Sequence, residues 1–136
     1  MIIGIIGCGN IAKAHIKALS KINIVASILL YDTNENNVHS ASEVSSKPIF
    51  IKNNISEIVE QSDGIIICTP NHTHEMIIKE ISTLKDIPIV CEKPLSTNID
   101  SAYRICEVAN KKSTHSDENK VSDVQKKVIE KKEQKQ

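Results

Sequence analysis

Residues 2–20 read IIGIIGCGNIAKAHIKALS, and this stretch decides the fold class. It begins with a short isoleucine-rich run, which is typical of a strand buried on both faces of a parallel sheet. A glycine-rich turn follows, and Ile11, Ala14 and Ala18 then recur at helical spacing, as in a helix that packs on a sheet. The stretch therefore predicts a strand at 2–6, a tight turn and a helix at 10–20.

The same alternation of strand-like and helix-like segments continues along the chain. Apolar, β-branched runs cover residues 24–31, 49–51, 64–68 and 87–91, and helical patterns cover residues 34–46, 55–61, 73–83 and 99–110. Because Asn and Ser dominate residues 34–46, we expect only a short or frayed helix there. Repeated strand–helix units of this kind predict an α/β fold with a Rossmann-like, doubly wound parallel sheet of about five strands.

Length and composition limit the class of protein. The 136 residues suffice for one hydrophobic core, and 40% hydrophobic and 25% charged residues are typical of soluble globular proteins. No apolar run approaches the roughly 18 residues of a membrane span, and the start lacks the basic region of a signal peptide. Scattered cysteines indicate buried thiols in a reducing cytoplasm, with neither a disulfide framework nor a zinc site. These cysteines are Cys8, Cys68, Cys91 and Cys106.

The last part of the chain has a different composition. Residues 1–110 contain nine Lys and Arg against twelve Asp and Glu, whereas residues 111–136 contain eight Lys against five acidic residues. The latter segment has too few apolar residues to offset the entropy of ordering it. We expect a domain at 1–110 and a polar, disordered or loosely helical tail at 111–136. Interspersed acids, and the lack of Arg and aromatic residues, argue against nucleic-acid binding by this tail.

The turn after the first strand contains the sharpest motif, Gly7-Cys8-Gly9-Asn10-Ile11-Ala12. In a GxGxxA motif, the first glycine makes the tight turn and the second lets the main chain approach a pyrophosphate. Ala12 permits close packing of helix against strand, and the helix start supplies unpaired N–H groups for phosphate oxygens. Glycines also occur in ordinary tight turns, so the motif depends on its surroundings.

The second predicted strand supplies these surroundings, because it ends at Tyr31-Asp32, twenty-five positions after Gly7. An acidic residue near this spacing binds the ribose hydroxyls of a dinucleotide. A carboxylate repels the 2′-phosphate of NADP, and residues 33–35 contain no Lys or Arg to neutralise that phosphate. The sequence therefore favours NAD over NADP. The alternative is that Asp32 only caps the next helix or turn.

Two further segments carry a family resemblance. Residues 63–74 read DGIIICTPNHTH, and residues 91–98 read CEKPLSTN. With GxGxxA and Asp32, these segments resemble the nucleotide-binding half of the Gfo/Idh/MocA oxidoreductases over residues 2–110.

The resemblance implies a role for each matched residue. The pyrophosphate would contact Gly7, Gly9, Asn10 and Ile11, and the adenosine ribose would contact Asp32. The path towards the nicotinamide would be lined by Thr69, Pro70 and Asn71. The nicotinamide itself would lie beside Glu92, Lys93 and Pro94, with Lys93 as the catalytic contact to substrate. His74 could approach the cofactor or substrate or act only as a polar cap, and His72 is the weaker candidate. No histidine has a partner at metal-ligand spacing.

Members of this family are longer than this chain. A sixth strand closes their nucleotide domain, and a second α/β domain supplies most of the substrate pocket. The resemblance therefore implies the NAD(H)-binding domain of an oxidoreductase for a sugar, polyol or related hydroxy compound. The chain would be a fragment, or a subunit whose protein partner supplies the substrate domain. Two alternatives remain open, a non-catalytic nucleotide-binding module and an inactive truncated remnant.

Overall fold

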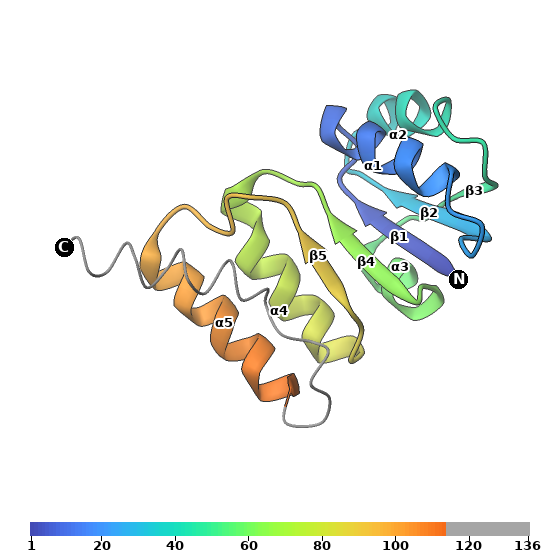
Figure 1. Ribbon diagram of the computed structural model, residues 1–136. Coiled ribbons are helices and arrows are strands. Elements are labelled where there is room, and N and C mark those ends of the chain that lie inside the picture. The colour runs from blue at the N-terminus through green and yellow to red at the C-terminus, as the bar shows by residue number, and fades with distance from the viewer. Residues whose placement is uncertain (114–136) are drawn as a thin grey trace.

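The computed structural model describes residues 1–113 and confirms the predicted fold class (Figure 1). Its strands form one parallel sheet in the order β3-β2-β1-β4-β5. The strands are β1 (Ile2–Ile6), β2 (Ser27–Tyr31), β3 (Ile49–Ile51), β4 (Gly64–Ile67) and β5 (Ile89–Cys91). The helices are α1 (Asn10–Ser20), α2 (Glu35–Ser42), α3 (Ile55–Gln61), α4 (His74–Leu84) and α5 (Ile99–Ser113), and a 3₁₀ turn, η1 (Asn71–Thr73), precedes α4.

Helices cover both faces of the sheet. Alternate strand residues such as Ile5 and Leu30 are buried with residues of α1 and α2. Their neighbours Ile6 and Leu29 are buried with residues of α3, α4 and α5. Figure 1 shows α5 beside α4. Because both faces of the strands are buried, the strands read as continuous apolar runs instead of alternating ones.

The element boundaries differ from the predicted ones mainly at β2. The strand begins at Ser27, because the preceding residues turn after α1 and the Val25 nitrogen donates to the Ile22 carbonyl at 3.1 Å. Ile24 is consequently 65% exposed. The helix predicted to be short is short, since α2 ends at Ser42 and buries only Val38 and Ala41. The helix α5 runs to Ser113, and the rest of the predicted tail lies outside the described residues.

The direction of winding reverses between β1 and β4. The chain passes outwards from β1 to β2 and β3, and then crosses to β4 and β5 on the other side. At such a switch point, the loops at the carboxyl ends of the strands diverge and leave a crevice. The two outer strands are β3 and β5, and Val90 of β5 is 57% exposed.

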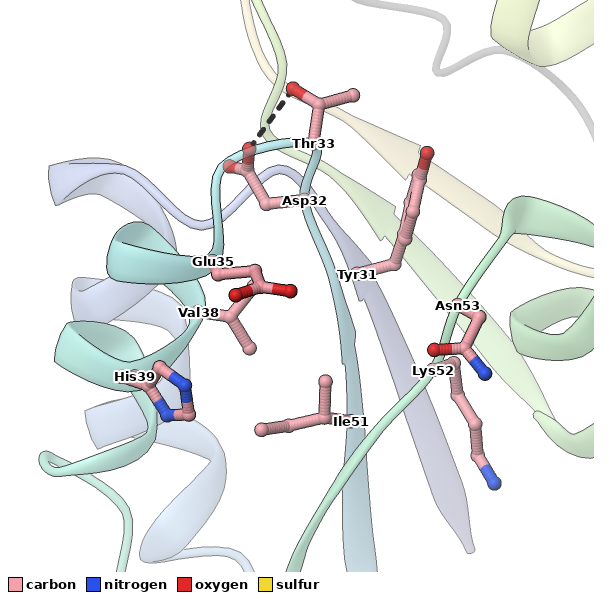
Figure 2. Close-up of a pocket in the computed structure, with 9 residues that line it drawn as sticks. All are labelled: Tyr31, Asp32, Thr33, Glu35, Val38, His39, Ile51, Lys52 and Asn53. Atoms are coloured by element: carbon pink, nitrogen blue, oxygen red, sulfur yellow. Dashed lines mark hydrogen bonds between the residues drawn. The ribbon is translucent and has the colours of Figure 1, made fainter.

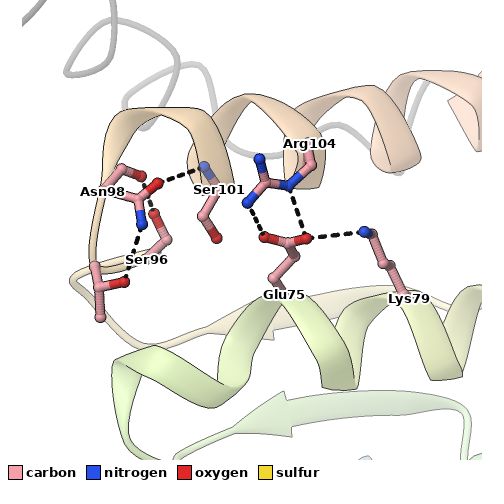
Figure 3. Close-up of polar contacts among 7 residues, drawn as sticks. Glu75, Lys79, Ser96, Asn98, Ser101 and Arg104 are labelled. Carbon is pink, nitrogen blue, oxygen red and sulfur yellow. Dashed lines mark hydrogen bonds and ion pairs between the residues drawn. The ribbon is translucent and has the colours of Figure 1, made fainter.

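A cluster of polar side chains joins α4 to α5 (Figure 3). The Glu75 carboxylate accepts hydrogen bonds from Nε and Nη2 of Arg104, both at 2.9 Å, and from Nζ of Lys79 at 2.8 Å. Hydrogen bonds from Arg104, then Lys79 and Ser101, hold the pKa of Glu75 well below its ordinary value. At the start of α5, the Ser101 nitrogen donates to Oδ1 of Asn98 at 2.8 Å. Within residues 1–113, no helix is long and apolar enough to cross a membrane.

Candidate functional site

A cleft of about 800 Å³ lies at the switch point, at the carboxyl ends of β1, β2 and β4. It is formed by the glycine-rich turn, the residues after β2, and the loop after β4. Of the residues predicted to contact the cofactor, the cleft brings together Gly7, Gly9, Asn10, Ile11, Asp32, Thr69 and Pro70.

The two glycines of the turn have different environments. Gly7 has a φ of +93°, and a Cβ there would lie 2.7 Å from main-chain atoms of Cys68 and Thr69. Gly7 is therefore required by the turn and by its contact with the loop after β4. A Cβ on Gly9, by contrast, would meet no atom within 4 Å in the described part of the chain. It would occupy the cleft, so the bare main chain at Gly9 fits close approach by a ligand phosphate.

The start of α1 is open towards the cleft. Gly9 is the N-cap of α1, and no side chain in residues 1–113 caps its first turn. The helices α2, α3 and α5 differ, because a first-turn nitrogen in each donates to an asparagine side chain, from Asn34, Asn54 and Asn98. The first-turn N–H groups of α1 and the positive end of its dipole can therefore receive an anionic ligand.

The Asp32 carboxylate has two main-chain partners. Its Oδ2 accepts a hydrogen bond from the Cys8 nitrogen, and its Oδ1 accepts one from the Asn34 nitrogen, each at 2.8 Å. Asp32 therefore does cap the turn that precedes α2, as the alternative prediction had it. An ionised carboxylate has about four lone-pair positions, so Asp32 can still accept hydrogen bonds from ribose hydroxyls.

A second hollow of about 490 Å³ adjoins the Asp32 end of the cleft, between α2 and β3 (Figure 2). Asp32 and Glu35 both line it, and Lys52 is the only Lys or Arg among its nine lining residues. Figure 2 shows the Lys52 side chain pointing away from the Asp32 carboxylate. This end of the cleft is therefore acidic.

His74 holds two loops together. Its side chain is buried, with the residue only 1% exposed. Nε2 lies 2.9 Å from the Thr69 carbonyl oxygen, and Nδ1 lies 3.0 Å from the Leu95 carbonyl oxygen. A neutral imidazole can donate to only one of these oxygens, whereas the imidazolium donates to both. The ring therefore faces main chain, and His74 is not among the residues that line the cleft.

The Glu-Lys-Pro segment follows β5, the strand next to β4 on the side away from Asp32. Oε1 of Glu92 lies 2.5 Å from Nε2 of His15 on α1. The Lys93–Pro94 peptide is cis. Glu92, Lys93, Pro94 and also Asn71 are not among the residues that line the cleft. The assignment of the first three to the nicotinamide, and of Asn71 to the path towards it, remains a prediction.

Sequence reasoning missed several residues of this region. His15 is separated from Glu92 by 77 positions, and nothing in the spacing of either residue signals the pair. The apolar lining of the cleft was also missed, because such residues cannot be told from core residues by their pattern. It includes Tyr31, Ile55, Met76 and Ile77.

Three thiols near the strand ends are unreactive at neutral pH. Burial, the largest cause, raises the pKa of Cys8, Cys68 and Cys91 to about 12. Within this rise, the second cause is the negative charge of Asp32 for Cys8 and of Glu92 for the other two. Because the thiolate is the nucleophile and metal ligand, these side chains behave as small apolar groups at neutral pH. Within the described residues, no group of three or more His, Cys, Asp or Glu could hold a metal ion.

The fold, the uncapped helix start and the acidic strand end define a dinucleotide-binding Rossmann domain. The Gfo/Idh/MocA family model, described as an oxidoreductase family with an NAD-binding Rossmann fold, matches residues 1–116. The chain belongs to this family, as its NAD-binding domain.

Individual relatives are consistent with this assignment. Glucose-6-phosphate 3-dehydrogenase of Bacillus subtilis is 33% identical over 112 residues, covering 82% of this chain and 31% of the relative. Inositol 2-dehydrogenase of Cereibacter sphaeroides is 30% identical over 107 residues, covering 77% of this chain and 31% of the relative. The structure of myo-inositol dehydrogenase from Lactobacillus casei, in complex with NAD(H) and myo-inositol, matches this chain with a TM-score of 0.71 at 22% identity. The match covers 83% of this chain and 34% of that one, and it shows a shared fold. The chain spans about a third of the length of the curated relatives it matches.

Proposed function

We propose that this chain binds NAD(H) in the cleft and serves as the nucleotide-binding part of an oxidoreductase for a sugar, polyol or related hydroxy compound. The observation that carries the proposal is the meeting of two features in one cleft. The uncapped start of α1 fits the pyrophosphate, and the Asp32 carboxylate fits the adenosine ribose. Gly7, Gly9, Asn10 and Ile11 would contact the pyrophosphate, and Thr69, Pro70 and Asn71 would line the path towards the nicotinamide.

The same end of the cleft supports a preference for NAD over NADP. The 2′-phosphate of NADP would lie near Asp32 and Glu35, which are both acidic. Lys52 points away from Asp32 and leaves this charge uncompensated (Figure 2). Placing a phosphate beside a carboxylate that no cation neutralises is electrostatically unfavourable.

The substrate class is inferred from relatives that are named as dehydrogenases of glucose 6-phosphate and of inositol. When bound, NAD⁺ would supply the acceptor for a hydride from a carbinol carbon of the substrate, and the hydroxyl proton would pass to a base on the polypeptide that completes the pocket. The Lys93 ammonium would polarise the oxygen on that carbon, and Glu92 and Pro94 would lie beside the nicotinamide. Hydride transfer needs a substrate held close to the nicotinamide, so further polypeptide would complete the pocket, from the same chain or a partner.

The cysteines support the cytoplasm as the compartment of this protein. Cys8, Cys68 and Cys91 lie at or just after the ends of β1, β4 and β5, which are adjacent in the sheet. All three are nevertheless free thiols. Thiols persist in this form in a reducing compartment.

Calorimetric titration of the 136-residue chain with NADH and NADPH tests the proposal. We expect NADH to bind with a dissociation constant of about micromolar size and NADPH to bind more weakly. Absence of NADH binding to chain that is demonstrably folded would contradict the proposal. If NADH binds but no sugar or polyol reduces NAD⁺, even with candidate partner chains, the chain is a non-catalytic nucleotide-binding module.

A further inference from the structure

A histidine side chain holds each end of the short segment that contains Lys93. On one side, Nε2 of His15 lies 2.5 Å from the Glu92 carboxylate, directly before Lys93. On the other side, Nδ1 of His74 lies 3.0 Å from the carbonyl oxygen of Leu95, directly after Pro94. These two histidines come from different helices, α1 and α4.

We propose that His15 and His74 are positioning residues that fix Lys93 at the nicotinamide end of the cleft. This inference rests on the proposed function, since it assigns the two histidines to the same cofactor site. Neither histidine contacts the cofactor directly in this arrangement. His15 acts through its contact with Glu92, which directly precedes Lys93 and so helps to place it.

The position of His15 supports this role. The sheet-facing side of α1 is filled by Ala12 and Ile16, both fully buried, so His15 is not needed for that packing. The side chains of His15 and Glu92 are 27% and 25% exposed, which places their contact in partly desolvated surroundings. A charge-assisted contact there is stronger than one at the open surface. The pair thereby connects the helix that would hold the pyrophosphate to the end of β5.

His74 connects the same segment to the loop after β4. Through Thr69, which lines the cleft, and Leu95, it links the loop after β4 to the loop after β5. Removing its buried ring would leave at least one of the two carbonyl oxygens without its donor, which costs folding free energy. The sharper test is therefore made at His15, which is partly exposed.

The test compares two ligands, NADH and ADP-ribose, on the full chain. ADP-ribose lacks only the nicotinamide, so it reports the pyrophosphate and adenosine contacts alone. The variants are His15→Ala, His15→Gln and Glu92→Gln, with Lys17→Ala, at an exposed position of the same helix, as the control. Dissociation constants come from calorimetry, the emission of bound NADH reports the nicotinamide surroundings, and urea denaturation verifies folding.

We expect His15→Ala to weaken NADH binding about fivefold or more, while ADP-ribose binding changes less than about twofold. His15→Gln, whose amide can donate to Glu92, should recover most of this loss. Lys17→Ala should leave the ratio of the two affinities unchanged. An unchanged ratio in folded His15→Ala and Glu92→Gln overturns the inference while the proposed function stands. If wild-type chain binds NADH no better than ADP-ribose, the inference is also overturned. If it binds neither ligand, the proposed function falls, and the inference falls with it.

Discussion

The main-chain nitrogen of Cys8 lies 2.8 Å from Oδ2 of Asp32, which ties the glycine-rich turn to the end of β2. The other oxygen of the same carboxylate accepts a hydrogen bond from the Asn34 nitrogen ahead of α2. Asp32 therefore stabilises the turn that forms the proposed pyrophosphate site, in addition to facing the proposed ribose site. A substitution at Asp32 has two separable effects, one on folding and one on cofactor choice.

Replacing Asp32 by alanine should weaken NADH binding and reduce the preference for NADH over NADPH, because the charge that repels the 2′-phosphate is lost. Loss of its two hydrogen bonds should also lower the free energy of unfolding by about 1–3 kcal/mol. Titration with both nucleotides and urea denaturation measure the two effects. Asp32→Asn is the control, because its amide oxygen keeps one acceptor and carries no charge. An unchanged NADH to NADPH ratio in Asp32→Asn would argue against the ribose assignment.

The same substitution should destabilise the chain at one glycine of the turn and leave its stability unchanged at the other. Gly7→Ala places a Cβ 2.7 Å from main-chain atoms at a φ of +93°. We expect it to lower the free energy of unfolding by about 2 kcal/mol or more. Gly9→Ala meets no protein atom within 4 Å in the described residues, so its stability should stay within about 0.5 kcal/mol of wild type.

The two alanine variants also separate folding from binding. Gly9→Ala should weaken NADH binding, because its Cβ projects into the space proposed for the pyrophosphate. Calorimetry and urea denaturation on both variants give the comparison. Normal NADH affinity in Gly9→Ala would place the pyrophosphate elsewhere.

The sequence predicts the elements whose structure depends on residues close to one another along the chain. The strand, turn and helix of residues 2–20 carry their own signals, so the predicted bounds of β1 and α1 agree with the structure to the residue. The start of β2 was predicted too early, because Ile24 and Val25 have β-branched side chains but lie in the turn after α1. Contacts between distant segments leave no such local signal, as the His15–Glu92 pair shows.

A buried hydroxyl offers a test of packing away from the proposed site. Ser62 is 1% exposed, and its Oγ has no hydrogen-bond partner among the described residues. Ser62→Ala removes this unsatisfied group and should raise the free energy of unfolding by about 1 kcal/mol, measured by urea denaturation. Ser20→Ala is the matched control with the opposite sign, since Ser20 Oγ donates to Ile16 at 2.8 Å and accepts from Ser46 at 3.2 Å. Destabilisation by Ser62→Ala would show that the hydroxyl is bonded in solution.

The buried thiols make the stability of the chain depend on alkaline pH. The pKa values of Cys8, Cys68 and Cys91 rise on folding from 9.0 to about 12. The folded chain therefore keeps protons that the unfolded chain releases, and the resulting stability is complete below about pH 9 and is lost as the pH rises towards 12. Each thiol contributes up to about 1.4 kcal/mol per pH unit in this window.

Urea denaturation under reducing conditions, between about pH 8 and pH 10, measures this loss as a falling midpoint. Cys68→Ala removes one of the three thiols, so its midpoint should fall less steeply than that of wild type. The comparison of slopes cancels the titration of lysines and tyrosines, which both proteins share. Equal slopes would mean that the Cys68 thiol ionises in the folded chain as readily as in the unfolded one, and its burial beside Glu92 would then not control its chemistry.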